Sequence, residues 1–144
     1  MIESDTIKLL RECDAGVKMG ISSIDDVLEY TSSEGLLKLL KECKKEHKAL
    51  DKEISRELDR FSDDGKEPNP MAKGMSWLKT TVKLSFNESD KTIAALITDG
   101  CNMGVKSLNK YLNEYEAAEE KAKDIAKRLI NSEERLAIDI RNYL

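Results

Sequence analysis

The stretch that decides the fold is Gly16-Val17-Lys18-Met19-Gly20-Ile21-Ser22-Ser23-Ile24, because a close relative of it returns at an offset of 84 residues. Residues 100–108 read Gly100-Cys101-Asn102-Met103-Gly104-Val105-Lys106-Ser107-Leu108, so both stretches share the frame G-x-x-M-G-[IV]-x-S-[IL]. A second echo, at an offset of 86 residues, pairs Leu50, Ile54 and Leu58 with Leu136, Ile140 and Leu144. Two helical hairpins of one ancestral pattern are the simplest explanation.

The composition is typical of a soluble helical bundle. Of 144 residues, 36% are charged, 40% are hydrophobic and 5% are aromatic, and there are two prolines. This length predicts a single domain over residues 1–144. The net charge of −4 argues against nucleic acid as a partner. Neither a run of roughly 20 apolar residues nor a signal-peptide region occurs. We therefore expect a cytoplasmic protein that binds neither nucleic acid nor a membrane.

Hydrophobic periodicity predicts long helices over about residues 5–30, 34–61, 90–115 and 118–142. Ser4, Ser33 and Ser89 are the expected N-caps of the first three. The turn at residues 116–119 contains no helix breaker and follows from the repeat alone. A short additional helix is predicted over residues 71–86, within the long connection between the hairpins. The predicted fold is all-α: two repeated helical hairpins joined by a long crossover, which is the ferritin-like four-helix bundle.

Four polar residues interrupt the apolar stripes, and burial without a partner would be costly for each of them. His47 on the second helix and Glu133 on the fourth occupy equivalent positions of the repeat. We expect them to face each other across the pseudo-twofold axis, as a buried ionic or hydrogen-bonded pair that fixes helix register. Asp14 and Thr98 are equivalent in the same way on the first and third helices. We expect them to form a second hydrogen-bonded pair in the core.

Two glycines recur in each half of the repeat, at residues 16 and 20 and again at residues 100 and 104. Each costs about 1 kcal/mol of helix propensity relative to alanine. Their recurrence indicates a structural reason, which is either close approach of two helices or space for a ligand.

The paired helix openings around Gly16 and Gly100, and the crossover segment Lys73-Gly74-Met75-Ser76-Trp77-Leu78-Lys79, carry a resemblance to known proteins. Over essentially its whole length, the chain resembles a bacterial ferritin-like family of unknown function that is distantly related to ferritins and rubrerythrins. Members of that wider superfamily often hold two metal ions, with a Glu from each of two helices and Glu-x-x-His from the other two. Such ligands suit iron or manganese.

The resemblance implies a degenerate di-metal site, because most of the expected ligands are replaced. The Glu expected on the first helix falls at Val17 or Lys18, and the Glu expected on the third falls at Cys101 or Asn102. The two Glu-x-x-His motifs become Lys44-Lys45-Glu46-His47 and Ile130-Asn131-Ser132-Glu133. One histidine remains and every expected carboxylate is gone, so we do not expect a di-iron oxidase.

Two functions remain open. The first, which we favour, is a non-catalytic ferritin-like bundle without a cofactor that serves as a binding or assembly module, as a homo-oligomer (a dimer) through its helical surfaces. The second is a metal-binding protein with a storage, sensing or residual redox role. His47, Glu133 and a thiolate from Cys43 or Cys101 would then hold one zinc or iron ion, because Cys43 and His47 are spaced i, i+4 and can reach the same ion. With a single histidine and no phosphate-binding loop, a metal-free enzyme has almost no support.

Overall fold

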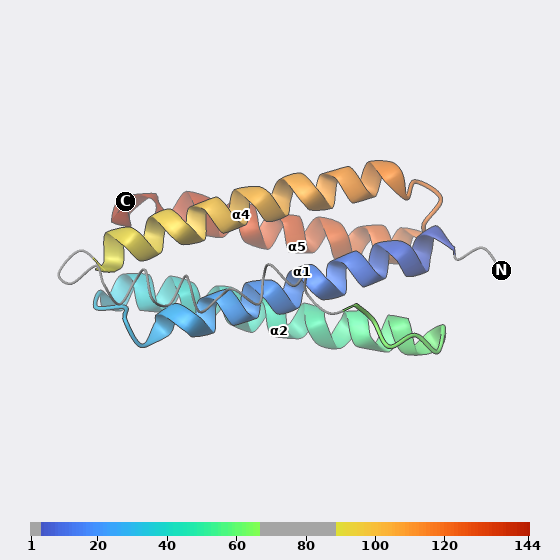
Figure 1. Ribbon diagram of the computed structural model, residues 1–144, viewed down its shortest axis with the longest axis horizontal. Coiled ribbons are helices and arrows are strands. Elements are labelled where there is room, and N and C mark those ends of the chain that lie inside the picture. The colour runs from blue at the N-terminus through green and yellow to red at the C-terminus, as the bar shows by residue number, and fades with distance from the viewer. Residues whose placement is uncertain (1–3, 67–88) are drawn as a thin grey trace.

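The computed structural model describes residues 4–66 and 89–144, so the short helix predicted over residues 71–86 lies outside the described residues. Four long helices and a terminal 3-10 turn make up the described chain (Figure 1): α1 (Asp5–Leu28), α2 (Glu34–Arg60), α4 (Ser89–Glu114), α5 (Glu120–Asp139) and η3 (Ile140–Tyr143). The all-α class predicted from the sequence is confirmed. Among the described residues, no helix has the length and apolar character that crossing a membrane requires.

Two of the three serines predicted to be N-caps cap their helices in the structure. The side chains of Ser4 and Ser33 each accept a hydrogen bond from a backbone N–H in the first turn, at 3.3 and 3.4 Å, and so cap α1 and α2. Ser89 was expected to be a cap but is the first residue of α4, and its hydroxyl donates to the carbonyl oxygen of Tyr30 at 3.1 Å. That hydrogen bond fastens the start of α4 to the end of α1.

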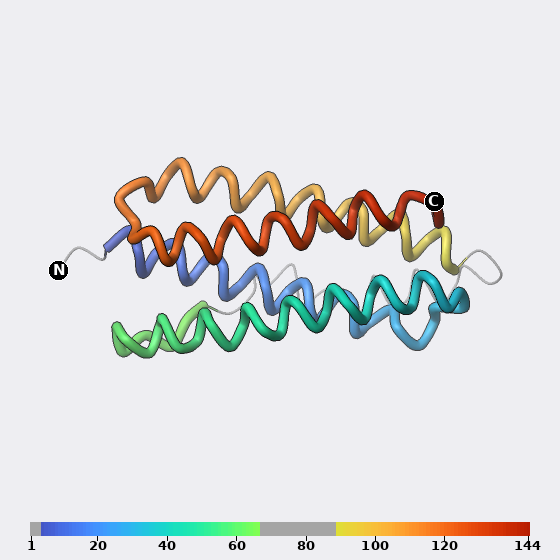
Figure 2. The backbone as a smooth tube through the Cα atoms, turned by 180° about the vertical axis from the view of Figure 1, so that it is seen from behind, coloured from blue at the N-terminus to red at the C-terminus, as the bar shows by residue number. Residues whose placement is uncertain are grey.

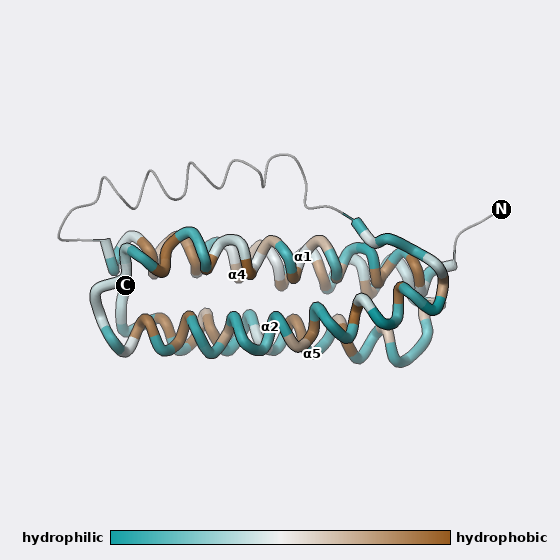
Figure 3. The backbone as a smooth tube through the Cα atoms, turned by 90° about the horizontal axis from the view of Figure 1, so that it is seen from below, coloured by the Kyte–Doolittle hydropathy of each residue, from teal (hydrophilic) through white to brown (hydrophobic). Residues whose placement is uncertain are grey.

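The helices form two antiparallel hairpins, α1 with α2 and α4 with α5, in which each helix runs the length of the molecule (Figures 1 and 2). Seen from the side, α1 and α4 form one layer and α2 and α5 form the other (Figure 3). Between the hairpins, α1 packs on α4 and α2 packs on α5, and both of these pairs are antiparallel. The end of α2 and the start of α4 lie at opposite ends of the bundle (Figure 1).

The core consists of two apolar clusters, one toward each end of the bundle. The first contains, among others, Leu9, Leu10, Val17, Leu50, Ile54, Leu58, Leu108, Ile125, Leu129 and Ile130. The second contains, among others, Ile24, Val27, Leu36, Leu40, Cys43, Ile93, Ile97, Cys101, Leu136 and Ile140. Along α2, residue 47 lies between the last member of one cluster and the first member of the other, and residue 133 has the same place on α5. Polar side chains therefore occupy the middle of the bundle.

Candidate functional site

The central polar layer consists of His47 from α2 and Glu133 from α5. Their side chains are almost fully buried, with 1% and 8% of the residue surface exposed. The Nε2 atom of His47 lies 3.8 Å from Oε1 of Glu133. The repeat predicted that these two side chains would face each other, and the structure places them side by side.

The recurring glycines of the repeat explain how this layer fits between the helices. A Cβ atom added at Gly20 would lie 2.7 Å from Cδ2 and 2.8 Å from Nε2 of His47. A Cβ atom added at Gly104 would overlap Oε2 of Glu133 and lie 2.8 Å from its Cδ. Each glycine therefore leaves space for the polar side chain of its own hairpin partner. The space predicted for either a helix contact or a ligand is filled by these two side chains.

The orientation of the imidazole follows from its surroundings. Its Nδ1 lies 3.1 Å from the carbonyl oxygen of Cys43, one turn earlier in α2. A carbonyl oxygen only accepts, so Nδ1 carries hydrogen and donates it. The same nitrogen lies 3.5 Å from the Cys43 thiol sulfur and 3.5 Å from the Ser132 hydroxyl. The other nitrogen, Nε2, faces Glu133.

The pair titrates as a unit that retains one proton. Burial lowers the pKa of His47, but its hydrogen bond to Cys43 and its ion pair with Glu133 outweigh that effect and raise the pKa to about 10. Burial raises the pKa of Glu133, which His47 opposes. The first shift favours a charged pair and the second a neutral one. In both cases the pair retains one proton around neutral pH, on Nε2 or on the carboxyl group.

The carboxyl group of Glu133 also affects the thiol of Cys101. Oε2 of Glu133 is buried and has no hydrogen-bond partner among the described residues. The negative charge of this carboxyl group raises the pKa of the Cys101 thiol of α4. Burial, with smaller contributions from Glu133 and Cys43, raises its pKa to about 12. Cys101 is therefore a protonated thiol at neutral pH.

The predicted metal ligands do not assemble into a metal site. The Cys43 sulfur lies on the Nδ1 side of His47 and the Glu133 carboxylate on the Nε2 side, so one ion cannot bind all three. In residues 4–66 and 89–144, no three His, Cys, Asp or Glu side chains are grouped as a metal ion would need. The positions that would supply carboxylates to a di-metal centre hold the buried side chains of Val17, Cys101 and Ile130. Lys44, which would place a cation at such a centre, instead pairs with Asp25 of α1. The residues present do not fit two metal ions.

The predicted pairing of Asp14 with Thr98 is wrong. Asp14 is buried and accepts hydrogen bonds from Nζ of Lys18 and the N–H of Lys66, both at 2.9 Å. Thr98 is only half-buried, and its hydroxyl donates to the carbonyl of Ala94 at 2.7 Å. Each residue lies six positions before the glycine at the central layer, and α1 and α4 are antiparallel. The two positions are therefore separated by about 18 Å along the bundle axis.

The partners of Asp14 show how the chain leaves α2. Gly65, at φ 85°, is in the left-handed region, and a Cβ atom there would overlap Oδ2 of Asp14. Asp63 forms an ion pair with Arg11 of α1 at 2.6 Å. Residues 63–66 therefore fold back onto α1. The glycine in the Asp63-Asp64-Gly65 stretch was the sequence signal for this turn, but its partner on α1 could not be read from local sequence.

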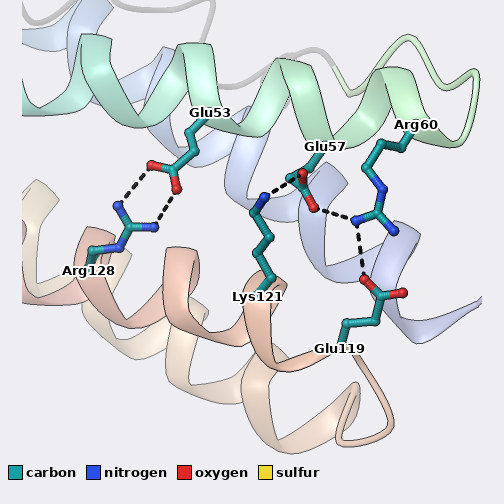
Figure 4. Close-up of polar contacts among 6 residues, drawn as sticks. All are labelled: Glu53, Glu57, Arg60, Glu119, Lys121 and Arg128. Carbon is teal, nitrogen blue, oxygen red and sulfur yellow. Dashed lines mark hydrogen bonds and ion pairs between the residues drawn. The ribbon is translucent and has the colours of Figure 1, made fainter.

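A row of ion pairs between α2 and α5 was also not predicted (Figure 4). Glu53 pairs with Arg128 through two hydrogen bonds of 2.6 and 2.8 Å. Glu57 is only 5% exposed and lies 2.7 Å from Arg60 and 3.1 Å from Lys121. Glu46 of α2 pairs with Arg135 of α5 in the same row. Glu46 and Glu53, and likewise Arg128 and Arg135, are seven residues apart, and this spacing was the available signal, because antiparallel helices bring such positions into register.

Comparison with known proteins defines the fold and leaves the function open. No family model matches the chain, and no curated protein matches it in sequence. The fold is similar to that of a solved structure described as the crystal structure of a DUF305 fragment from Deinococcus radiodurans. The TM-score is 0.77, over 97% of this chain and 95% of that one, at 11% sequence identity. At this identity, the likeness shows a shared all-helical fold and nothing more.

Proposed function

We propose that this protein is a ferritin-like bundle that has lost its di-metal centre and acts as a non-catalytic binding or assembly module. The placement of the helices supports the ferritin-like assignment. Because α2 ends and α4 begins at opposite ends of the bundle, the chain between them has to connect the two ends, as the long crossover of that arrangement does. The duplicated glycine and polar positions support an origin from two hairpins.

The observation that carries the proposal is the filled central layer. His47 and Glu133 occupy the middle of the bundle, each with less than a tenth of its surface exposed, and two glycines are shaped around them. Catalysis requires a reactive group that a substrate can approach. A buried pair of this kind instead favours one helix register over others. The layer therefore suits a structural role.

We further infer that the protein assembles as a homodimer in the cytoplasm. Met103 on α4 is 61% exposed, and flexible apolar side chains of this kind suit partner surfaces. Its location within the repeated glycine motif places it near the middle of the helix. Three cysteines without disulfides support a reducing compartment.

Elemental analysis and light scattering of the untagged protein test both parts of the proposal. After incubation with Zn²⁺ or Fe²⁺ and desalting, we expect far less than one metal ion per chain and the mass of a dimer. Met103→Asp should give a monomer, whereas the same change at the neighbouring exposed residue, Asn102→Asp, should not. One or two tightly held ions per chain would overturn the metal-free assignment. A wild-type monomer would overturn the assembly role.

A further inference from the structure

The outer side of α2 carries a line of exposed lysines. They recur at alternating intervals of three and four residues, which places them on one side of the helix: Lys38, Lys41, Lys45, Lys48 and Lys52. The buried residues of the same stretch follow the same spacing on the opposite side, as Leu40, Cys43, His47, Leu50 and Ile54. The five lysines, which we call the lysine ridge, extend over about 21 Å of the helix axis.

Charged residues on the flanks of the lysine ridge are neutralised by neighbouring helices, whereas the ridge itself is not. On the side that faces α1, Lys44 pairs with Asp25. On the side that faces α5, Glu46 and Glu53 pair with arginines of that helix. Within the part of the chain that the structure describes, none of the five ridge lysines has an ion pair. These lysines are therefore available to an anionic partner.

The lysine ridge is a positive face on a molecule that is negative as a whole. The net charge of −4 includes the five ridge lysines, so the rest of the chain carries −9. Two acidic residues beside the ridge, Glu42 and Asp51, leave it a local excess of three positive charges. Charges farther away than about 8–10 Å are screened at physiological ionic strength, so a partner at the ridge interacts mainly with this excess. The net charge, from which we expected no membrane partner, does not describe this face.

The shape of the lysine ridge favours a flat anionic surface over a nucleic acid. A line of charges on the outer side of a helix can touch a plane along its whole length. The phosphate strands of a duplex wind around its axis, so such a line meets phosphates at only a few points. A single strand can follow the line, but proteins that bind single strands stack the bases on aromatic side chains. Helix α2 contains no Phe, Tyr or Trp.

We propose that the lysine ridge binds the surface of a membrane that contains anionic lipids, through contacts of its ammonium groups with lipid phosphates and carboxylates. This inference is independent of the assembly role, because Met103 lies on α4, the helix diagonal to α2 (Figure 3). The cytoplasmic leaflet of a membrane is negative and attracts clusters of lysines, each of which contributes about fivefold to the binding constant. The local excess of three charges should therefore strengthen binding about a hundredfold.

Sedimentation with vesicles tests the proposal. The untagged wild-type protein is mixed, at about 0.1 M salt, with vesicles of phosphatidylcholine alone or of equal parts phosphatidylcholine and phosphatidylserine. We expect about a hundredfold stronger binding to the vesicles that contain phosphatidylserine, and loss of that difference at about 1 M salt, where charges are screened within about 3 Å. Equal binding to the two kinds of vesicle would overturn the proposal. Release of the protein from the vesicles by duplex or single-stranded DNA, at an equal concentration of anionic groups, would overturn the choice of a membrane; we expect the protein to stay bound.

Two double variants, each of which removes two positive charges, separate the lysine ridge from the net charge of the molecule. Lys41→Gln with Lys45→Gln should weaken binding to the phosphatidylserine vesicles about 25-fold. Lys106→Gln with Lys110→Gln removes two exposed lysines of α4 and should change binding by less than about twofold, because α4 lies diagonally across the bundle from α2. Glutamine forms helices about as well as lysine, and circular dichroism checks that both variants fold. Equal binding by the two variants would show that the ridge has no special role.

Discussion

Alanine substitution of the four repeat glycines should change the free energy of unfolding in opposite directions within each pair. The first glycine of a pair, Gly16 or Gly100, should give a more stable protein, and the second, Gly20 or Gly104, a less stable one. A helical glycine replaced by alanine normally stabilises a protein, by about 1 kcal/mol. Among the described residues outside the local helix backbone, no atom lies within 4 Å of a Cβ added at Gly100, and the nearest to one added at Gly16 is Cδ2 of Leu129 at 3.9 Å. Both substitutions should therefore be stabilising by about that amount. Gly20 and Gly104 should behave differently because of the side chains they face.

The loss of stability expected at Gly20 and Gly104 depends on which neighbouring atoms have to move. At Gly104, the added carbon overlaps Oε2 of Glu133 and lies 2.8 Å from Cδ and 2.9 Å from Oε1, so the whole carboxyl group has to shift. Overpacking of this kind costs about 1–3 kcal/mol. A shift that separates Glu133 from His47 adds part of the roughly 3–5 kcal/mol of a broken buried pair. After the helix-propensity gain, the expected net effect is a loss of about 1–3 kcal/mol. Gly20 should lose at least as much, because the ring it meets is anchored through Nδ1.

Urea unfolding followed by circular dichroism measures all four variants. In thermal melts, each kcal/mol corresponds to about 3 °C for a chain of this size. The double mutant Gly104→Ala/Glu133→Ala should be more stable than the sum of the single effects predicts, because the clash is removed. Four stabilising glycine substitutions would refute the view that the glycines make room for the polar layer. Four equal losses would also refute it.

Three further predictions concern other charged residues. His47→Leu alone should cost about 3–5 kcal/mol, and adding Glu133→Leu should recover most of it; equal unfolding free energies for single and double mutants would show that the pair does not interact. The pKa of Asp63 lies below its usual 3.8, first because its carboxylate accepts hydrogen bonds from Arg11 of α1. Asp63 therefore stabilises the folded state fully above that value, and this contribution is lost as the pH falls through the lower folded-state pKa. Asp63→Asn should therefore lose less stability than wild type between about pH 6 and pH 2, and equal losses would contradict this. Glu57→Gln should cost about 1–3 kcal/mol and Glu53→Gln about 0–1, because only Glu57 is buried; denaturant unfolding that reverses this order would refute the difference.

The fold was largely predictable because the information lies in periodic local patterns. Apolar residues that recur every three to four positions indicate a helix whatever that helix packs against. All described helix ends therefore fall within three residues of the predicted bounds. The turn between α4 and α5 could be placed although it contains no breaker, because the repeat supplied the missing signal. The pairing of His47 with Glu133 followed from the same symmetry, since both positions lie at its axis.

Predictions failed where a contact depends on distance from that axis. Symmetry relates Asp14 to Thr98 but places the two on opposite sides of the central layer, because α1 and α4 are antiparallel, so equivalence in sequence did not imply contact. The burial of Glu57 was not predicted, because this residue lies in a charged stretch and its cover comes from α5. The divergence of Cys43 and Glu133 around His47 depends on side-chain rotation, which i, i+4 spacing does not determine.

The polar layer of His47 and Glu133 separates the two apolar clusters, and it is therefore a boundary between two cooperatively unfolding units. The contacts of each cluster lie within its own half of the long axis, and the polar layer adds little apolar burial that would hold the two halves together. Helical segments on one side can therefore fray or open while those on the other stay protected. Amide hydrogen exchange resolved along α2 should show this as a step in protection at the turn that contains His47, so that a single continuous helix reports two opening free energies.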